Sequence, residues 1–270
     1  MEKKLSVDVF IKNGNEKIEG YYYHNADVDS QVAIIFHGDK KNYEDNSALL
    51  NAIFNSFARM GFSTLMINFS RKTVRKEKVS RQDSNREAEC EPEKETEEAT
   101  VALNWVHEKN FESRDYWICS FGQGVLPTLQ LVMRRPEINN YILIDPVLGR
   151  DDLNFIVPCL AYGMIMRSES NINFTEEYML DMQERLITKT ESRVETDTIF
   201  DNDKDINATI LETQSVLDRY IKRKQDEFLE SSKLKIRDKK RRRRKKKRLD
   251  DIDSRVEYIN PIQPLDLDNI

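Results

Sequence analysis

The sequence predicts an α/β fold built on a doubly wound, mainly parallel sheet. Short apolar runs alternate with stretches whose apolar residues recur at helical spacing, and each run ends in a loop. Several runs are apolar at successive positions, which is typical of strands buried on both faces. Ligands bind at the carboxyl ends of the strands in such sheets, whose crossovers are right-handed. A site is therefore expected in the loops after Phe36, Ser70, Phe121, Asp145, Ser168 and Phe200.

The chain is expected to open with a hairpin, because LSVDVFI and KIEGYYYH flank the turn-like KNGNE. Further strands are predicted in QVAIIFHG, FSTLMINFS, YWICSF, NYILIDP, YGMIMRS and RVETDTIF. Helices are predicted in NSALLNAIFNSFARMG, ATVALNWVHEKN, GVLPTLQLVMRRP, TEEYMLDMQERLI and residues 206–228. The stretch VLGRDDLNFIVPCLA is predicted as a loop. Residues 71–98 contain almost nothing that could enter a core, so they are expected to form a solvated loop or an exposed helix.

Length and composition predict one domain, residues 1–228 with the polar insertion 71–98, followed by a charged tail over 229–270. The three cysteines have neither a disulfide pattern nor the paired spacing of a zinc site, which favours a reducing compartment. No apolar stretch resembles a signal-peptide core or approaches the ~20 residues of a membrane span. We expect a cytoplasmic protein without a cofactor or metal.

The tail holds the strongest local charge. Residues 233–248 contain thirteen basic residues and one acidic residue, which is a local charge of +12. Because the whole chain has a net charge of −5, the rest of it carries −17. An acidic body is a poor phosphate binder, so binding to nucleic acid, an anionic surface or an import receptor is expected of the tail alone. The ten consecutive basic residues are Lys239, Lys240, Arg241, Arg242, Arg243, Arg244, Lys245, Lys246, Lys247 and Arg248. A solvated, self-repelling tail is the alternative, and an unknown protein partner is also expected.

Four stretches resemble small bacterial α/β-hydrolases of the dienelactone-hydrolase and serine-esterase type: FHGDKKNYEDN, ARMGFSTLMINF, EEATVALNWV and WICSFGQGVLPTLQLVMRRPEI. The first resembles the family's loop after the third strand, and the last resembles its strand, nucleophile elbow and helix. The resemblance covers roughly residues 1–225 and is specific around 114–145. It implies an α/β-hydrolase-like fold and a catalytic triad of Ser at the elbow, Asp after a later strand and His near the end.

The resemblance also implies that all three triad positions are altered. In the ungapped match Gly122 takes the position of the nucleophile and Ser120 that of the preceding glycine. Glu169 or Asn171 occupies the turn in which the family has its catalytic Asp. Lys204 or Asp205 takes the position of the His, and no histidine follows the elbow, since the chain has only His24, His37 and His107. Glycine at the elbow would relieve a backbone strain of about 1–3 kcal/mol.

The oxyanion site is weakened as well, because Lys41 and Asn42 replace the family's glycine pair, while His37, Gly38 and Asn46 are retained. We therefore expect a catalytically inactive α/β-hydrolase-like protein that acts as a binding or interaction module. The alternative is an active serine esterase or hydrolase that uses Ser120, or Cys119, with His37 or Lys204 as an unusual base. Asp145, Asp151 and Asp152 lie at the expected face without a ligand set of metal-like spacing. Export to a host cell and its nucleus is an alternative to the cytoplasm.

Overall fold

A computed structural model of the chain describes residues 6–27, 30–38, 40–69, 92–169, 171, 174–187, 194–199 and 207–230. In this part of the chain eight strands form one sheet in the order β1-β2-β4-β3-β5-β6-β7-β8. β1 pairs antiparallel with β2 and β2 with β4, whereas all other neighbours are parallel, so the predicted mainly parallel sheet is confirmed. The strands are β1 Val7–Asn13, β2 Glu16–Tyr23, β3 Val32–His37, β4 Ser63–Asn68, β5 Tyr116–Phe121, β6 Ile138–Ile144, β7 Tyr162–Ser168 and β8 Val194–Ile199.

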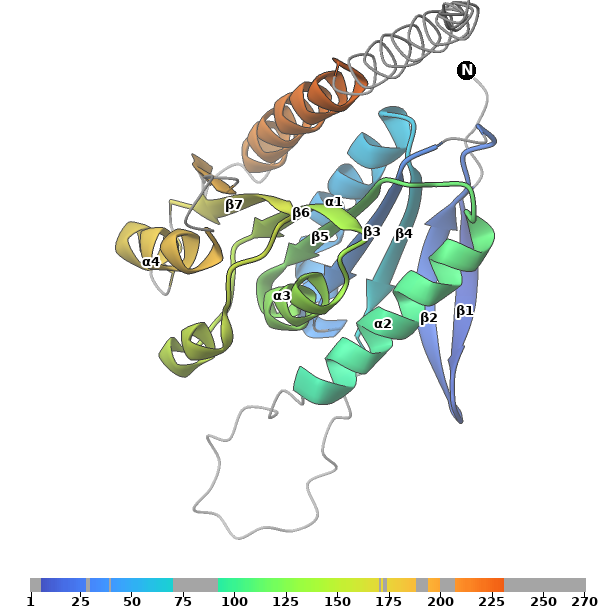
Figure 1. Cartoon of the computed structure of the whole chain (residues 1–270), viewed down its shortest axis with the longest axis horizontal. Helices are drawn as coiled ribbons and strands as arrows, with labels where there is room; N and C mark the ends of the chain where they lie inside the picture. Colours follow the sequence, from blue (N-terminus) through green and yellow to red (C-terminus); the bar gives the residue numbers. More distant parts are fainter. Residues whose placement is uncertain are drawn as a thin grey trace, which may run out of the picture. The chain divides into compact units, whose positions relative to one another are not determined.

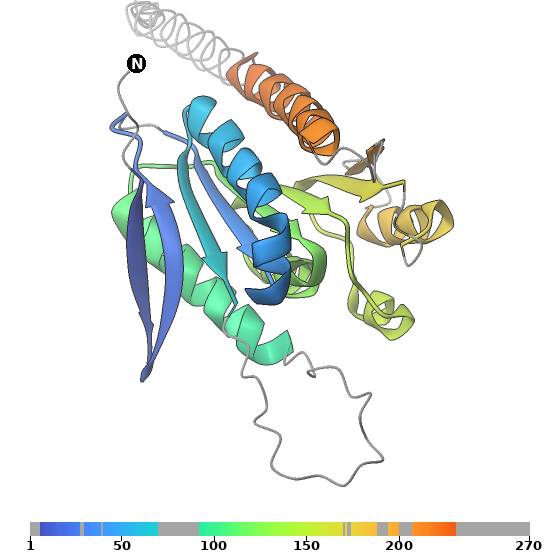
Figure 2. The same cartoon turned by 180° about the vertical axis from the view of Figure 1, so that it is seen from behind.

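Helices cover both faces of the sheet. They are α1 Lys40–Arg59, α2 Pro92–Lys109, α3 Val125–Arg134 and α4 Glu176–Leu186. Residues 207–230 form a further helix. Two short 3-10 helices, η1 Gly122–Gly124 and η2 Arg150–Phe155, follow β5 and β6. Figure 1 shows α2 and α3 side by side in front of the sheet, and Figure 2 shows α1 on the opposite face. This is the doubly wound arrangement that the alternation of apolar runs predicts.

The pleat of the central strands divides the core between the two helical layers. Ile34 and Phe36 of β3 and Ile118 of β5 belong to the core that also contains side chains of α2, α3 and α4. Trp117, one residue before Ile118, instead meets Phe57 of α1 with ring centroids 6.3 Å apart. Because successive strand residues point to opposite faces, the face of every β3 and β5 side chain follows from these contacts.

Two predicted segments are corrected by the structure. The loop expected to run from Phe36 to Asn46 is short, because α1 begins at Lys40. No glycine or proline follows Gly38 in this stretch, so nothing in it interrupts helical hydrogen bonding. The insertion 71–98 is predicted to form a solvated loop or an exposed helix. Its described part, from Pro92, is helical, but the side chains of Glu95 and Glu98 are buried.

These acidic residues enter the interior because α2 packs on α3 and β1. Burial of a carboxylate depends on tertiary partners that composition does not reveal. A third predicted segment is also corrected, because the stretch VLGRDDLNFIVPCLA, predicted as a loop, contains the 3-10 helix η2.

Contacts between residues divide the chain into two units, residues 1–218 and residues 219–270. In the first unit Gln214 donates a hydrogen bond to the Ala52 carbonyl of α1 at 3.1 Å, and Asp218 pairs with Arg59 at 3.0 Å. In the second unit Lys224 pairs with Glu227 at 3.0 Å. The basic run 239–248 lies outside the described residues, and the domain boundary at residue 228 stays a prediction.

Candidate functional site

Gly122 lies at the turn between β5 and η1, where the chain leaves the sheet and enters α3. Its φ is +60°, a left-handed conformation that L side chains rarely adopt. A Cβ added at this position would meet only Val147 Cγ2, at 4.0 Å, so the space is open. The Gly122 carbonyl accepts a hydrogen bond from the Val147 amide at 3.1 Å. The turn thus has a left-handed backbone that would be strained for a residue with a Cβ, and its tip carries no side chain.

Gly124 fits the same turn for a different reason. Its φ is an ordinary −68°, but an added Cβ would lie 3.0 Å from the Phe36 carbonyl oxygen and 3.2 Å from His37 Cα. The start of α3 therefore approaches the end of β3 so closely that only glycine fits without a shift of backbone.

Ser120 and Cys119, the two fallback nucleophiles, both lie inside β5. Ser120 is 0% exposed, and its Oγ has no hydrogen-bond partner in the described part of the chain. The Cys119 side chain is 1% exposed, and burial raises the pKa of its thiol far above the usual range. Cys119 therefore stays protonated, and neither side chain projects from the turn.

His37 ends β3 and lies next to the elbow strand, in register with Phe121. It is 3% exposed, and burial lowers its pKa to about 4. The ring is therefore neutral at physiological pH and is a weak base. Because Phe36 belongs to the core under α2–α4, the pleat directs His37 to the α1 face, whereas Ser120 shares the opposite face with Ile118.

The two other histidines lie at the amino end of the parallel strands. His24 follows β2 and shares a hydrogen bond with the Tyr22 hydroxyl at 3.0 Å. His107 of α2 shares one with the hydroxyl of Tyr116, the first residue of β5, at 2.6 Å. Both rings thus form hydrogen bonds at the amino ends of the parallel strands, whereas Gly122 lies at the carboxyl end of β5.

The turn after β7, where the resemblance implies the catalytic acid, holds Glu169 and Asn171. Glu169 is exposed, and its amide donates to the Ile199 carbonyl at 2.9 Å. The Asn171 side chain donates to Asp145 at 3.3 Å and accepts from the Phe174 amide at 3.1 Å. Lys204 lies outside the described residues, as does Asp205.

The other residues predicted for the carboxyl ends of the strands belong to a helix or are engaged locally. Lys41, Asn42 and Asn46 belong to α1, so the loop that carries the family's oxyanion glycines is absent from this segment. The Asp152 carboxylate accepts from the Gly149 amide at 2.6 Å and caps η2. The described residues include no group of three or more His, Cys, Asp and Glu that could hold a metal ion.

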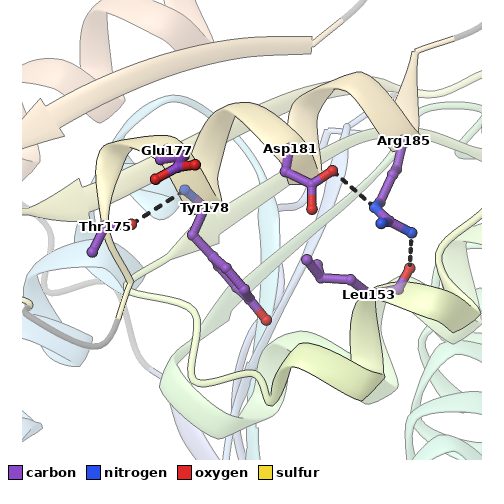
Figure 3. A pocket seen from close by; sticks show the side chains of 6 residues that line it. All are labelled: Leu153, Thr175, Glu177, Tyr178, Asp181 and Arg185. Atoms are coloured by element: carbon purple, nitrogen blue, oxygen red, sulfur yellow. Dashed lines mark hydrogen bonds and ion pairs between the residues drawn. The ribbon is translucent and has the colours of Figure 1, made fainter.

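A groove of about 380 Å³ lies between α4 and η2. Figure 3 shows the Tyr178 side chain directed from α4 toward the η2 segment, where its hydroxyl donates to the Gly149 carbonyl at 2.7 Å. Arg185 spans the other end of the groove, because it pairs with Asp181 at 3.1 Å and donates to the Leu153 carbonyl at 3.0 Å. The lining residues are Leu153, Thr175, Glu177, Tyr178, Asp181 and Arg185.

None of these lining residues was predicted from the sequence. The acidic residues in the first turn of α4 and the basic residue in its last turn complement the dipole of any helix, and nothing in this pattern signals a groove.

The fold has counterparts among solved structures. ATU1826 from Agrobacterium tumefaciens, a protein of unknown function and candidate α/β hydrolase, superposes with a TM-score of 0.67 at 22% identity, over 82% of this chain and 97% of that one. An α/β serine hydrolase homologue from Coxiella burnetii gives 0.62 at 14% identity, over 79% and 96%. Est1E from Butyrivibrio proteoclasticus gives 0.61 at 12% identity, over 79% and 97%. The chain therefore has an α/β-hydrolase fold.

Sequence comparison adds a bacterial relative. The uncharacterized protein RP471 of Rickettsia prowazekii (strain Madrid E) is 28% identical over an alignment of 181 residues, and the match covers 64% of this chain and 71% of that protein. No protein-family model matches the sequence. No helix in the described ranges is long and apolar enough to cross a membrane.

Proposed function

We propose that the chain is a catalytically inactive protein of α/β-hydrolase fold that acts as a binding or interaction module. The observation that carries the proposal is Gly122, which has the left-handed backbone of an elbow nucleophile, with a φ of +60°, but no side chain. Nucleophilic catalysis needs a hydroxyl or thiol exposed at the turn and a base within hydrogen-bond reach. Neither requirement is met by Gly122 and its described neighbours.

The buried positions of the fallback residues argue against the active alternative. Ser120 is enclosed in β5 on the face opposite to His37, so the pair cannot act as nucleophile and base without rearrangement of the strands. Cys119 shares the α1 face with His37, but burial keeps its thiol protonated. A neutral imidazole with a pKa of about 4 is also far from the value that suits a base near neutral pH.

Two parts of the chain are candidates for binding. The groove between α4 and η2, about 380 Å³ in volume, has the size of a small-ligand site. The basic run 239–248 has the composition of a segment that binds nucleic acid or another polyanion. The proposed setting is the cytoplasm of a bacterium, and export to a host nucleus is the alternative.

The test is hydrolysis of short acyl esters by the purified full-length chain, together with labelling by a fluorophosphonate probe. We expect the folded protein to show neither turnover nor labelling, and the variants Ser120→Ala and Cys119→Ala to behave like the wild type. Labelling of the wild type that disappears in Ser120→Ala would show that the serine is a nucleophile and would refute the proposal.

A further inference from the structure

Asp145 has an unusual backbone at the carboxyl end of β6. Its φ is +44°, and among the described residues it is the non-glycine residue with a positive φ. Aspartate enters this left-handed region more readily than most residues, but the conformation is still costly. Such a conformation persists only where the surrounding contacts determine it.

The contacts of Asp145 lie on β7 and the turn that follows it. The carboxylate accepts hydrogen bonds from the Ser168 amide at 2.6 Å, from the Ser168 hydroxyl, and from the Asn171 side chain at 3.3 Å. The Asp145 amide donates to the Met166 carbonyl at 2.9 Å. Both carboxylate oxygens are thus occupied by donors from one short segment.

The same segment is connected to its other neighbours. The Asn171 amide donates to the Ser168 carbonyl at 3.1 Å, which closes the turn, and the Glu169 amide donates to Ile199 at the end of β8 at 2.9 Å. Two residues after Asp145, the Val147 amide donates to the Gly122 carbonyl at 3.1 Å. A chain of hydrogen bonds therefore links the ends of β5, β6, β7 and β8.

We propose that Asp145 is a latch, a residue whose hydrogen bonds hold the carboxyl ends of β6 and β7 in one conformation. The left-handed backbone directs the carboxylate across to β7, and the carboxylate then fixes the turn 168–171 through Ser168 and Asn171. Asp145 acts through these residues and is a positioning residue. The latch stands on its own contacts and does not depend on the absence of catalysis.

Hydrogen exchange of the full chain tests the latch. In Asp145→Ala the amides of Ser168, Glu169 and Asn171 should exchange at least about tenfold faster than in the wild type, because a hydrogen bond to a charged group contributes about that factor. The amides of Met164 and Ile165 in the interior of β7 should exchange at unchanged rates. Faster exchange confined to the turn separates the latch from a general loss of stability.

Two further variants sharpen the result. Asp145→Gly removes the carboxylate but relieves the left-handed backbone, so it should lose protection at Ser168 as Asp145→Ala does. Asp152→Ala removes a carboxylate that accepts from Gly149 in the preceding loop and should leave the turn 168–171 unchanged. Should Asp145→Ala fail to fold, Asp145→Gly, which adopts the left-handed backbone without strain, still removes the acceptor of the Ser168 amide.

The latch is refuted if the amides of Ser168, Glu169 and Asn171 keep wild-type exchange in a folded Asp145→Ala variant. It is equally refuted by wild-type protection in Asp145→Gly, because the backbone alone would then hold the turn. Acceleration spread evenly over β7 would also contradict it, since Asp145 would then be an ordinary stability determinant.

Discussion

Replacement of Gly122 by alanine should destabilise the chain by about 1–2 kcal/mol, which is the cost of a left-handed backbone for a residue with a Cβ. The φ of +60° at this position sets the penalty. Crowding adds nothing, because the new Cβ would lie no closer than 4.0 Å to Val147 Cγ2. For a chain of this size, a loss of about 1 kcal/mol lowers the Tm by roughly 2–4 °C.

Two variants separate backbone strain from crowding in this turn, one at Gly122 and one at Gly124. Gly122→Asn should cost less than Gly122→Ala although asparagine is larger, because asparagine adopts the left-handed conformation more readily. Gly124→Ala should cost about 1–3 kcal/mol through overpacking, because its φ is ordinary but its Cβ would press on the backbone of Phe36 and His37.

Denaturant unfolding at constant m-value measures all three free-energy changes. An alanine at position 122 that leaves stability unchanged or raises it would show that the turn has no left-handed residue there, and the elbow assignment would be refuted. A larger loss for asparagine than for alanine would mean that the space at the turn is closed.

Three other predictions concern the core, a buried carboxyl group and the tail. Gly163→Ala should cost about 3 kcal/mol in denaturant unfolding, because its Cβ would overlap the buried Tyr141 ring, and a neutral result would contradict the packing of β7 on β6. Burial raises the pKa of the Asp115 carboxyl, although hydrogen bonds from Gln31, Trp117 and Asn140 oppose the shift. A raised pKa means that this group's contribution to stability is full below the unfolded-state value of about 4 and is lost as the pH rises, so Asp115→Asn should gain stability relative to the wild type from pH 4 toward neutrality. Equal pH profiles would contradict that reasoning. Deletion of residues 233–248 should abolish salt-sensitive retention on polyanionic resin, and unchanged retention would exclude the basic run as the binding segment.

Much of the sheet could be predicted from the sequence because its strands are buried on both faces. The runs YWICSF and YGMIMRS match β5 and β7 residue for residue, since a polar or turn-forming segment bounds each run. The opening hairpin follows in the same way from the turn around Gly14, whose φ is +55°. Local pattern and tertiary burial agree in these segments.

The sequence was less informative where tertiary contacts decide the structure. Polar residues in the first two turns of α2 suggested solvent exposure, yet Glu95 and Glu98 are buried by packing of the helix. Asp145 appeared as one of several acids near the site, and its left-handed backbone and bonds to Ser168 could not be read from its neighbours in the chain. The groove depends on how α4 meets η2, which no local pattern encodes.

The central claim is that no residue of this fold acts as a nucleophile. Intact-mass measurement of the full-length chain after prolonged incubation with an excess of fluorophosphonate tests it most directly, with an active serine esterase as the positive control. The open, side-chain-free turn at Gly122 and the buried Ser120 predict the unmodified mass. A stoichiometric adduct that maps to Ser120 in the folded protein would contradict the claim.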